Sequence, residues 1–259
     1  MINNFADKKF VITREPDESS DAIEKLRQLG SDVLFFPSIK IVPVSDYSLF
    51  DSKIRNQKYD FVIFTSGNAV DYFYSRLSEI EYNFDVEAKI AAVGSKTADT
   101  LLSKGTAADI LPERFSSTGL LEYFKDRKLS GRRILIPGSA ISRTELKIGL
   151  RRRGAEVDFV PVYDVIMPDR NEVIVPINKI NKEKFDMFMF TSPSAYKNFI
   201  CLMDIGKPRD FFSQTKVAAI GPTTRNAILK SGVTVDVVPE IYTIEKMIEG
   251  VINFYERNT

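Results

Sequence analysis

The sequence predicts an α/β protein in which two similar, doubly wound parallel-sheet domains are joined by a two-stranded β hinge. Three observations lead to this prediction. Long segments repeat at a nearly constant offset, short apolar runs alternate with helical patterns, and two extended linkers occupy matching places in the repeats. At 259 residues the chain also has the length at which a single core commonly gives way to two domains.

The internal repeat consists of three blocks with offsets of 126, 127 and 124 residues. The paired segments are 59–73 (YDFVIFTSGNAVDYF) with 185–199 (FDMFMFTSPSAYKNF), 89–105 (KIAAVGSKTADTLLSKG) with 216–232 (KVAAIGPTTRNAILKSG), and 8–37 with 132–161. Offsets this similar indicate a duplication in which each half carries the same series of supersecondary units.

Each unit of the repeat begins with a short, continuously apolar run, as expected for a parallel strand covered on both faces. We expect strands at 10–13, 32–36, 61–64, 90–93, 108–111, 134–136, 156–160, 187–190, 217–220 and 235–238. Helical patterns follow, and the last two helices should cover 117–125 and 243–255. Four helices should end in a left-handed cap at a glycine, namely Gly30, Gly105, Gly154 and Gly232.

The linkers at 37–43 (PSIKIVP) and 161–168 (PVYDVIMP) occupy equivalent places and are expected to be extended. Two extended crossovers at matching positions predict a paired, two-stranded hinge. From the repeats alone, the domains can be consecutive or can exchange chain segments.

Composition excludes several classes of protein. A net charge of +1 is too balanced for a nucleic-acid surface, and no apolar stretch reaches the length of a membrane helix or has the form of a signal peptide. A single cysteine, Cys201, is compatible with a reducing cytoplasm, and its helical neighbours predict that it packs in the core. We therefore expect a cytoplasmic protein that contacts neither nucleic acid nor membrane.

The absence of histidine removes the usual general base and the commonest metal ligand. No phosphate loop, no G-x-G-x-x-G and no cluster of acids emerges, so we expect no metal and no cofactor. The arginine run 151–153 is interpreted as a solvated helix end that complements the helix dipole.

Hydroxyls and glycines gather where strands end and helices begin, which is the edge at which parallel α/β sheets bind ligands. These loops are Thr13-Arg14, Thr65-Ser66-Gly67-Asn68, Gly94-Ser95-Lys96-Thr97, Pro137-Gly138-Ser139, Thr191-Ser192-Pro193-Ser194 and Gly221-Pro222-Thr223-Thr224. Any one of them can be a simple helix cap. Six of them facing one cleft between two domains predict a site for a large polyanion, with carboxylates or phosphates.

Several motifs together resemble those of the uroporphyrinogen-III synthase family, over nearly the whole chain and in the same order. They are VITREP, YDFVIFTSGNAV, AAVGSKTA, VPVY, FMFTSPSA and AAIGPTTRNAILKSG. FTSPSA followed by AAIGPTT is the most specific part. The resemblance implies that the chain exchanges segments, with residues 1–38 and 169–259 in one domain and 42–164 in the other.

The resemblance also implies a substrate and a reaction. The substrate is hydroxymethylbilane, a linear tetrapyrrole with eight carboxylates. Its cyclisation, with inversion of ring D and loss of water, gives uroporphyrinogen III in haem biosynthesis, so the enzyme is a cyclising lyase without a cofactor. The family implies a monomer and is compatible with transient contact to the preceding pathway enzyme.

By the same resemblance, Tyr163 in VPVYDV matches the tyrosine that assists departure of the hydroxyl. The residues matched to substrate binding are Arg14, Thr65, Ser66, Gly67, Ser95, Thr97, Gly138, Ser139, Ser192, Pro193, Ser194, Thr223 and Thr224. Two other classes stay open from the residues alone. One is a cytoplasmic two-lobed binding protein for a polyanionic small molecule, and the other is a sugar or nucleotide transferase.

Overall fold

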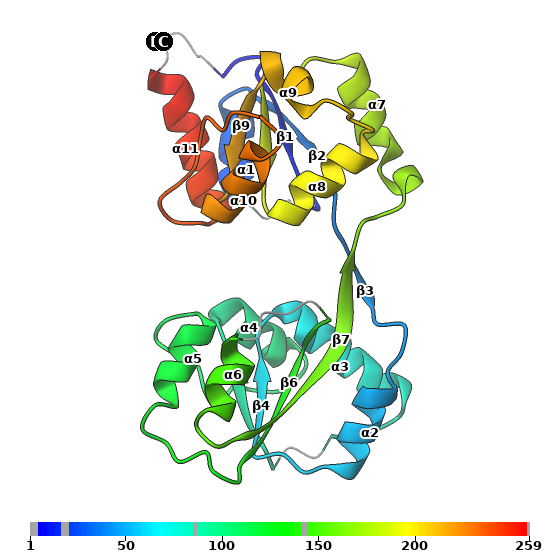
Figure 1. Cartoon of the computed structure of the whole chain (residues 1–259), viewed down its shortest axis with the longest axis vertical. Coiled ribbons are helices and arrows are strands. Elements are labelled where there is room, and N and C mark those ends of the chain that lie inside the picture. Colours follow the sequence, from blue (N-terminus) through cyan, green and yellow to red (C-terminus); the bar gives the residue numbers. More distant parts are fainter. Residues whose placement is uncertain (1–4, 17–20, 85–86, 141–144, 258–259) are drawn as a thin grey trace. The chain divides into compact units, whose positions relative to one another are not determined.

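The computed structural model describes residues 5–16, 21–84, 87–140 and 145–257. Its internal contacts divide the chain into two compact units. Unit 1 comprises residues 1–40 and 166–259, and unit 2 comprises residues 41–165. Each unit has its own parallel sheet and its own cores, which confirms the predicted α/β class (Figure 1).

The sheet of unit 1 has the strand order β2-β1-β8-β9, with every pairing parallel. The strands are β1 (Lys9–Ile12), β2 (Asp32–Phe35), β8 (Met187–Phe190) and β9 (Lys216–Ala219). Because the central strands β1 and β8 come from opposite ends of the chain, unit 1 is discontinuous in sequence.

The sheet of unit 2 has the order β3-β7-β6-β4-β5, and its β7-β6-β4-β5 part is parallel. The strands are β3 (Lys40–Pro43), β4 (Phe61–Phe64), β5 (Lys89–Ala92), β6 (Arg133–Ser139) and β7 (Glu156–Ile166). By the repeat offsets, the parallel strands β7, β6, β4 and β5 correspond in order to the four of unit 1. The duplication therefore extends to sheet topology.

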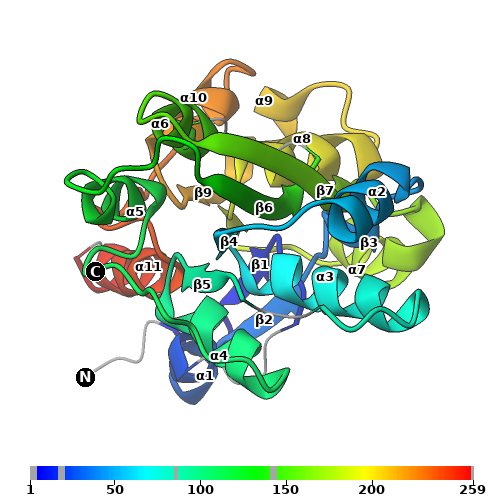
Figure 2. The ribbon, with the colours of Figure 1, turned by 90° about the horizontal axis from the view of Figure 1, so that it is seen from below.

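Helices cover both faces of each sheet, as expected for continuously apolar strands. In unit 1 these are α1 (Asp21–Gln28), α7 (Ile174–Lys182), α8 (Pro193–Leu202), α9 (Pro208–Phe211), α10 (Pro222–Leu229) and α11 (Ile244–Arg257), with short 3₁₀ turns at Arg170–Val173 and Phe212–Gln214. In unit 2 they are α2 (Ser48–Asn56), α3 (Gly67–Glu79), α4 (Ser95–Ser103), α5 (Ser117–Tyr123) and α6 (Glu145–Arg151). Helices α5 and α6 pack side by side (Figure 2).

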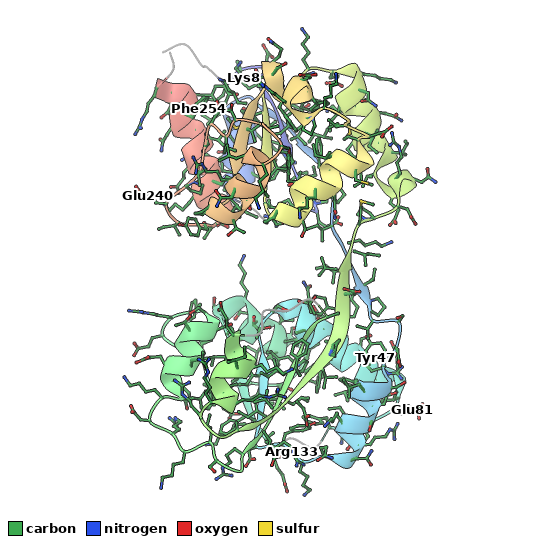
Figure 3. The ribbon with its side chains drawn as sticks, in the orientation of Figure 1. Lys8, Tyr47, Glu81, Arg133, Glu240 and Phe254 are labelled. Atoms are coloured by element: carbon green, nitrogen blue, oxygen red, sulfur yellow. The ribbon has the colours of Figure 1, made fainter. Side chains whose placement is uncertain are left out.

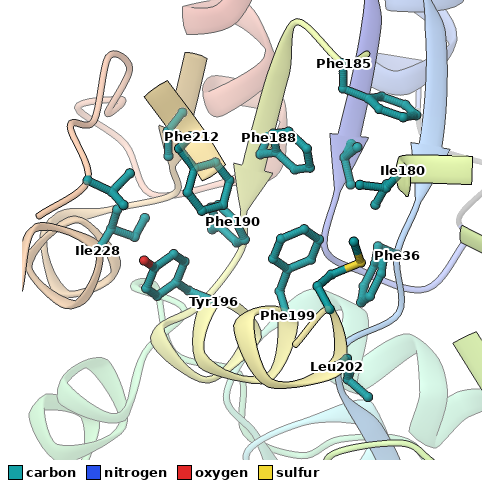
Figure 4. Packing of buried hydrophobic residues seen from close by; sticks show 14 of the residues in the cluster. Phe36, Ile180, Phe185, Phe188, Phe190, Tyr196, Phe199, Leu202, Phe212 and Ile228 are labelled. Carbon is teal, nitrogen blue, oxygen red and sulfur yellow. The ribbon is translucent and has the colours of Figure 1, made fainter. Parts of the chain in front are cut away.

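The two faces of each sheet form separate cores because successive side chains of a strand point to opposite faces. In β8, Phe188 and Phe190 join one core and Met187 and Met189 join the other. Phe199 of α8 is fully buried in the first of these cores, where its ring lies 5.5 Å from those of Phe188 and Phe190 (Figure 4).

The connections between the units run through β3 and β7, which are neighbours in the sheet of unit 2. The boundaries fall between residues 40 and 41 and between 165 and 166, within these two strands. Strand β7 is 11 residues long, so it continues past its pairing with β6. Of the two predicted linkers, residues 40–43 and 161–166 are thus in strands, whereas 37–39 and 167–168 are not.

Three details of the sequence-based expectation are wrong. The segments 108–111 and 235–238 reduce to isolated bridges at Ile110 and Val237, because each contributes one pairing to an outer strand. Cys201 is exposed, since α8 turns Ala195, Tyr196, Phe199 and Leu202 inward and leaves Cys201 on the opposite side. Residues 137–139 belong to β6 and do not form a loop before a helix.

The four helix-ending glycines have positive φ angles, as predicted, with values of 91° at Gly30, 80° at Gly105, 87° at Gly154 and 76° at Gly232. The left-handed conformation is accessible there because glycine has no Cβ. Among the residues that the structure describes, no helix is long and apolar enough to cross a membrane.

Candidate functional site

The carboxyl end of β4 leads into the N-terminus of α3 in unit 2. Ser66 is the N-cap, with extended φ and ψ of −158° and 157°, and its hydroxyl accepts a hydrogen bond from the Ala69 N–H at 3.2 Å. The N–H groups of Gly67 and Asn68 precede the first intrahelical bond and point away from the helix. This end of α3 therefore offers backbone donors and a positive dipole.

Tyr163 of β7 lies beside this helix start. Its hydroxyl is 3.2 Å from the Ser66 hydroxyl, and its ring stacks on that of Tyr72 with centroids 5.8 Å apart and an interplanar angle of 24°. Tyr72 donates a hydrogen bond to the Ile41 carbonyl at 3.1 Å. Tyr163 is only 8% exposed, so packing and a hydrogen bond both restrict its hydroxyl.

Gly138 and Ser139 also lie beside Tyr163, but they belong to a strand and not to the predicted loop before a helix. They are the last, buried residues of β6, and the register with β7 shifts between them, so that Gly138 pairs with Pro161 and Ser139 with Tyr163. Tyr163 then accepts a hydrogen bond at its carbonyl from the Ala140 N–H at 3.1 Å. Such a bulge redirects side chains at the end of a strand. Here it brings Ser139 into register with Tyr163.

The second helix start of unit 2, at α4, has a glycine as its N-cap. Gly94 makes no side-chain capping bond, and its carbonyl accepts from the Thr97 N–H at 3.1 Å. Ser95 is exposed in the first turn, whereas Thr97 is buried. Of the two predicted binding residues, only Ser95 presents its hydroxyl to solvent. Thr65, at the other helix start, is half-buried.

In unit 1, α8 has the same cap as α3. Ser192 is the N-cap with φ and ψ of −163° and 163°, and its hydroxyl accepts from the Ala195 N–H at 2.9 Å. Pro193, in the first turn, has no N–H to donate. Ser194 is exposed. This helix start therefore offers one backbone donor fewer than that of α3.

Thr13 and Thr191 join the ends of β1 and β8 by reciprocal hydrogen bonds. The Thr191 hydroxyl donates to the Thr13 carbonyl at 2.7 Å, and the Thr13 hydroxyl accepts from the Thr191 N–H at 3.2 Å. Thr13 is 2% exposed. These two threonines therefore support the edge of the sheet, while Arg14 follows Thr13 as a half-buried residue at the same edge.

At the start of α10, Gly221 takes the place that Gly94 has in unit 2. It is an N-cap without a side-chain capping bond, followed by Pro222. Thr223 is exposed, and Thr224 is 2% exposed. The two units thus agree in burying the equivalent threonines Thr97 and Thr224.

The structure brings Ser66, Gly67, Ser139 and Tyr163 together at one edge of unit 2. It places Arg14, Ser192, Pro193, Ser194, Thr223 and Thr224 along the corresponding edge of unit 1. Sequence reasoning missed the stacking of Tyr72 on Tyr163, although Tyr72 lies in the helix that Ser66 caps. No group of three or more Cys, Asp or Glu side chains among the described residues could hold a metal ion.

The fold and the helix starts together define the class of protein. It is an α/β protein of two units, and in each unit the N-termini of helices lie at the carboxyl ends of the strands of a parallel sheet. Residues 20–249 match the family model described as uroporphyrinogen-III synthase HemD. The chain therefore belongs to the uroporphyrinogen-III synthase family, whose members are cyclising lyases of tetrapyrrole biosynthesis.

Individual proteins agree with this assignment. A protein of Methanothermobacter thermautotrophicus is 30% identical over 92% of this chain and 94% of its own length. The uroporphyrinogen-III synthase of Synechococcus elongatus is 28% identical over 97% of both chains. Among solved structures, a uroporphyrinogen III synthase mutant from Thermus thermophilus has a TM-score of 0.59 and 18% identity, covering 96% of this chain and 99% of its own. That structure supports the fold.

Proposed function

We propose that this chain cyclises hydroxymethylbilane to uroporphyrinogen III, with loss of water and inversion of ring D. The observation that carries this proposal is the placement of the Tyr163 hydroxyl 3.2 Å from Ser66 at the N-terminus of α3. A proton donor beside a helix N-terminus suits a substrate that must lose a hydroxyl while its carboxylates are held.

The eight carboxylates of the substrate are bound mainly by backbone N–H groups at the helix starts. Both units contribute through the residues assigned above, which are Arg14, Thr65, Ser66, Gly67, Ser95, Thr97, Gly138, Ser139, Ser192, Pro193, Ser194, Thr223 and Thr224. Thr97 and Thr224 are buried, and the Thr97 N–H already donates to the Gly94 carbonyl at 3.1 Å, so these two threonines act by holding the helix starts whose outer N–H groups bind the carboxylates. Gly138 and Ser139 act at the end of β6.

Tyr163 donates its proton to the departing hydroxyl of the substrate. The carbon–oxygen bond breaks, water leaves, and the electron-rich pyrrole stabilises the cation that remains. Ring D attacks this cation through its bridge-bearing carbon and forms a spirocyclic intermediate. The old bridge bond of ring D then breaks and re-forms at the free carbon of ring D, and the proton released from that carbon restores the Tyr163 hydroxyl. Because pyrroles expel hydroxide with little help, a chain without histidine is adequate. The protein's main contribution is to hold the conformation that gives the inverted product.

The test supplies hydroxymethylbilane generated in situ and separates the type I and type III uroporphyrinogens by chromatography. We expect mostly the type III isomer. A protein that binds hydroxymethylbilane but leaves only the spontaneous type I isomer would be a binding protein, and the proposal would be wrong.

The Tyr163→Phe variant tests the role of the hydroxyl. We expect kcat to fall about tenfold, below the roughly 10²- to 10⁴-fold that positioned acids commonly supply, because the leaving group departs readily. The product should stay type III, since binding is unchanged. An unchanged kcat would remove Tyr163 from the reaction, and complete loss of activity would contradict binding and conformational control by the backbone.

The proposal extends to the setting of the enzyme. We propose that the enzyme is a cytoplasmic monomer. Because the linear substrate also closes spontaneously, the enzyme receives it directly from the preceding enzyme of the pathway. Light scattering after size-exclusion chromatography tests the monomer. Transient contact is tested by comparing the type III fraction with the preceding enzyme present and with prepared substrate.

A further inference from the structure

A fourth repeated segment lies outside the residues assigned above. Residues 112–116 read PERFS and residues 239–243 read PEIYT, at the offset of 127 that also relates the α4 and α10 regions. Ser116 caps α5 by accepting from the Gly119 N–H at 3.0 Å, and the Thr243 hydroxyl accepts from the Lys246 N–H at 3.3 Å. In both units an aromatic residue, Phe115 or Tyr242, directly precedes the capping residue.

An apolar residue at this position commonly packs onto the first turns of the helix it precedes. These two rings are not packed in this way, since Phe115 is 59% exposed and Tyr242 is 60% exposed. Neither belongs to a hydrophobic core cluster. The packing explanation therefore does not account for either ring.

Each ring lies instead against the N-cap glycine of the neighbouring helix. A Cβ added to Gly94 would lie 3.4 Å from the Cβ of Phe115 and 3.7 Å from its Cγ. A Cβ added to Gly221 would lie 3.1 Å from the Cγ of Tyr242. Both glycines have extended φ angles that any residue adopts, −154° and −175°. Close approach of the ring therefore gives a reason for glycine at Gly221, where the starts of α3 and α8 have serine, whereas a Cβ at Gly94 would only make ordinary contact with Phe115.

The loops that carry the rings also line pockets, of about 740 Å³ in unit 2 and about 570 Å³ in unit 1. Glu113 and Glu240 occupy equivalent places in these pockets, whereas Phe115 and Tyr242 line neither. The rings are thus directed to the helix starts at the carboxyl ends of β5 and β9.

An exposed apolar side chain at equivalent positions of both units does not by itself indicate a binding site. Leu102 and Leu229 are also equivalent and exposed, at 66% and 40%. They lie at the C-terminal ends of α4 and α10, far from the first turns of those helices. The aromatic pair differs because each ring lies beside open backbone N–H donors. Such donors bind an anion, and an exposed ring next to them is suited to a ligand that is flat as well as anionic.

We infer that Phe115 and Tyr242 are substrate-contact residues, each packing against the face of one pyrrole ring whose carboxylate is bound at the adjacent helix start. This inference rests on the proposed function. Each of the four pyrroles has a flat apolar face and carries two of the eight carboxylates. An aromatic side chain next to N–H donors matches both features. Since single-bonded bridges let each pyrrole rotate, such contacts also orient the rings for closure.

The experiment compares Phe115→Leu, Tyr242→Leu and the double variant with the wild type in the same cyclisation assay. We expect each single variant to raise KM about fivefold and the double variant about twentyfold, as loss of an aromatic contact predicts. The type III fraction should fall in the double variant. Phe115→Tyr and Tyr242→Phe keep the rings and should stay within about twofold of the wild-type KM.

The matched control is Leu102→Ala with Leu229→Ala, which removes another exposed, equivalent pair and should leave KM unchanged. Thermal melting shows whether each variant folds, and Phe115→Gln with Tyr242→Gln repeats the test with side chains suited to solvent. A double variant with the wild-type KM and product ratio would overturn this inference alone. A wild-type protein that makes only the type I isomer would instead overturn the proposed function.

Discussion

The two units share the interactions at the amino ends of their strands and differ at the carboxyl ends, where we propose that the substrate binds. At the amino ends of the strands, Asp60 accepts from the Arg133 N–H at 2.8 Å, and its counterpart Asp186 accepts from the Lys9 N–H at 2.9 Å. Asp109 and Asp236 are likewise equivalent and accept from the N–H groups of Ile90 and Val217. Figure 3 labels Arg133 and Lys8 at these ends of the two sheets.

At the carboxyl ends the helix caps still correspond, but the side chains around Tyr163 do not. Ser66 contacts Tyr163, whereas the residue equivalent to Tyr163 in the other repeat is Ile39. Unit 1 instead has the reciprocal bonds of Thr13 and Thr191. The comparison teaches that duplication preserved the interactions that build each sheet, while the side chains at the proposed substrate edge diverged. We therefore expect stability to respond alike in the two units, whereas the contribution of a side-chain hydroxyl to kcat should come from the Ser66–Tyr163 contact of unit 2.

The largest expected effect concerns the equivalent core residues Phe73 and Phe199, which are 1% and 0% exposed. Replacing either by alanine should lower the free energy of unfolding by about 3–5 kcal/mol, because a large cavity remains in a packed core. Denaturant unfolding measures the loss, and hydrogen exchange assigns it to a unit. Because the cores are separate, Phe73→Ala should loosen unit 2 and Phe199→Ala unit 1. Equal loosening of both units by either variant would show that the cores are not independent.

An intermediate effect concerns the acid stability that Asp60 provides. Although burial acts to raise its pKa, the hydrogen bond from the Arg133 N–H and the Arg132 guanidinium keep the pKa of Asp60 below its ordinary value of 3.8. A carboxyl group with a lowered folded pKa stabilises the protein above its unfolded pKa, and that stability is lost as the pH falls through the folded value.

We expect Asp60→Asn to cost about 1–2 kcal/mol at neutral pH, the range for a partly solvated hydrogen bond to a charged group. Its unfolding free energy should then depend less on pH below about 4 than that of the wild type. Urea unfolding at a series of acidic pH values measures this. Parallel curves for variant and wild type would show that Asp60 is not responsible for acid sensitivity.

The smallest expected effect separates the two serine caps. Ser66→Ala and Ser192→Ala each remove one capping bond and should each cost about 1 kcal/mol of stability. Only Ser66→Ala also removes the hydroxyl that positions Tyr163, so it alone should lower kcat, by about threefold, as loss of a modest hydrogen bond predicts. In the Tyr163→Phe background this decrease should disappear. Equal kinetics of the two serine variants would show that the Ser66–Tyr163 contact has no catalytic role.

Much of the framework could be predicted because local signals encode it. Continuous apolar runs mark strands covered on both faces, and the glycines at 30, 105, 154 and 232 mark helix ends through a conformation that other residues rarely adopt. The exposure of Cys201 follows from a local pattern that the sequence-based interpretation overlooked, because Cys201 comes four and three residues after Lys197 and Asn198 and so shares their polar side of α8. The helices α2 and α7 were missed because they lie outside the three repeated blocks, although they correspond to each other at the offset of 126.

What the sequence determined by itself is the repeated order of strands and helices and the residue types at the helix starts, because periodicity and capping act over a few residues. Only the tertiary structure decided which of those residues meet. The bulge that aligns Ser139 with Tyr163, the hydroxyl contact of Tyr163 with Ser66 and the approach of Phe115 to Gly94 join residues far apart in the chain. Such pairings depend on strand register and helix packing, which no local pattern specifies.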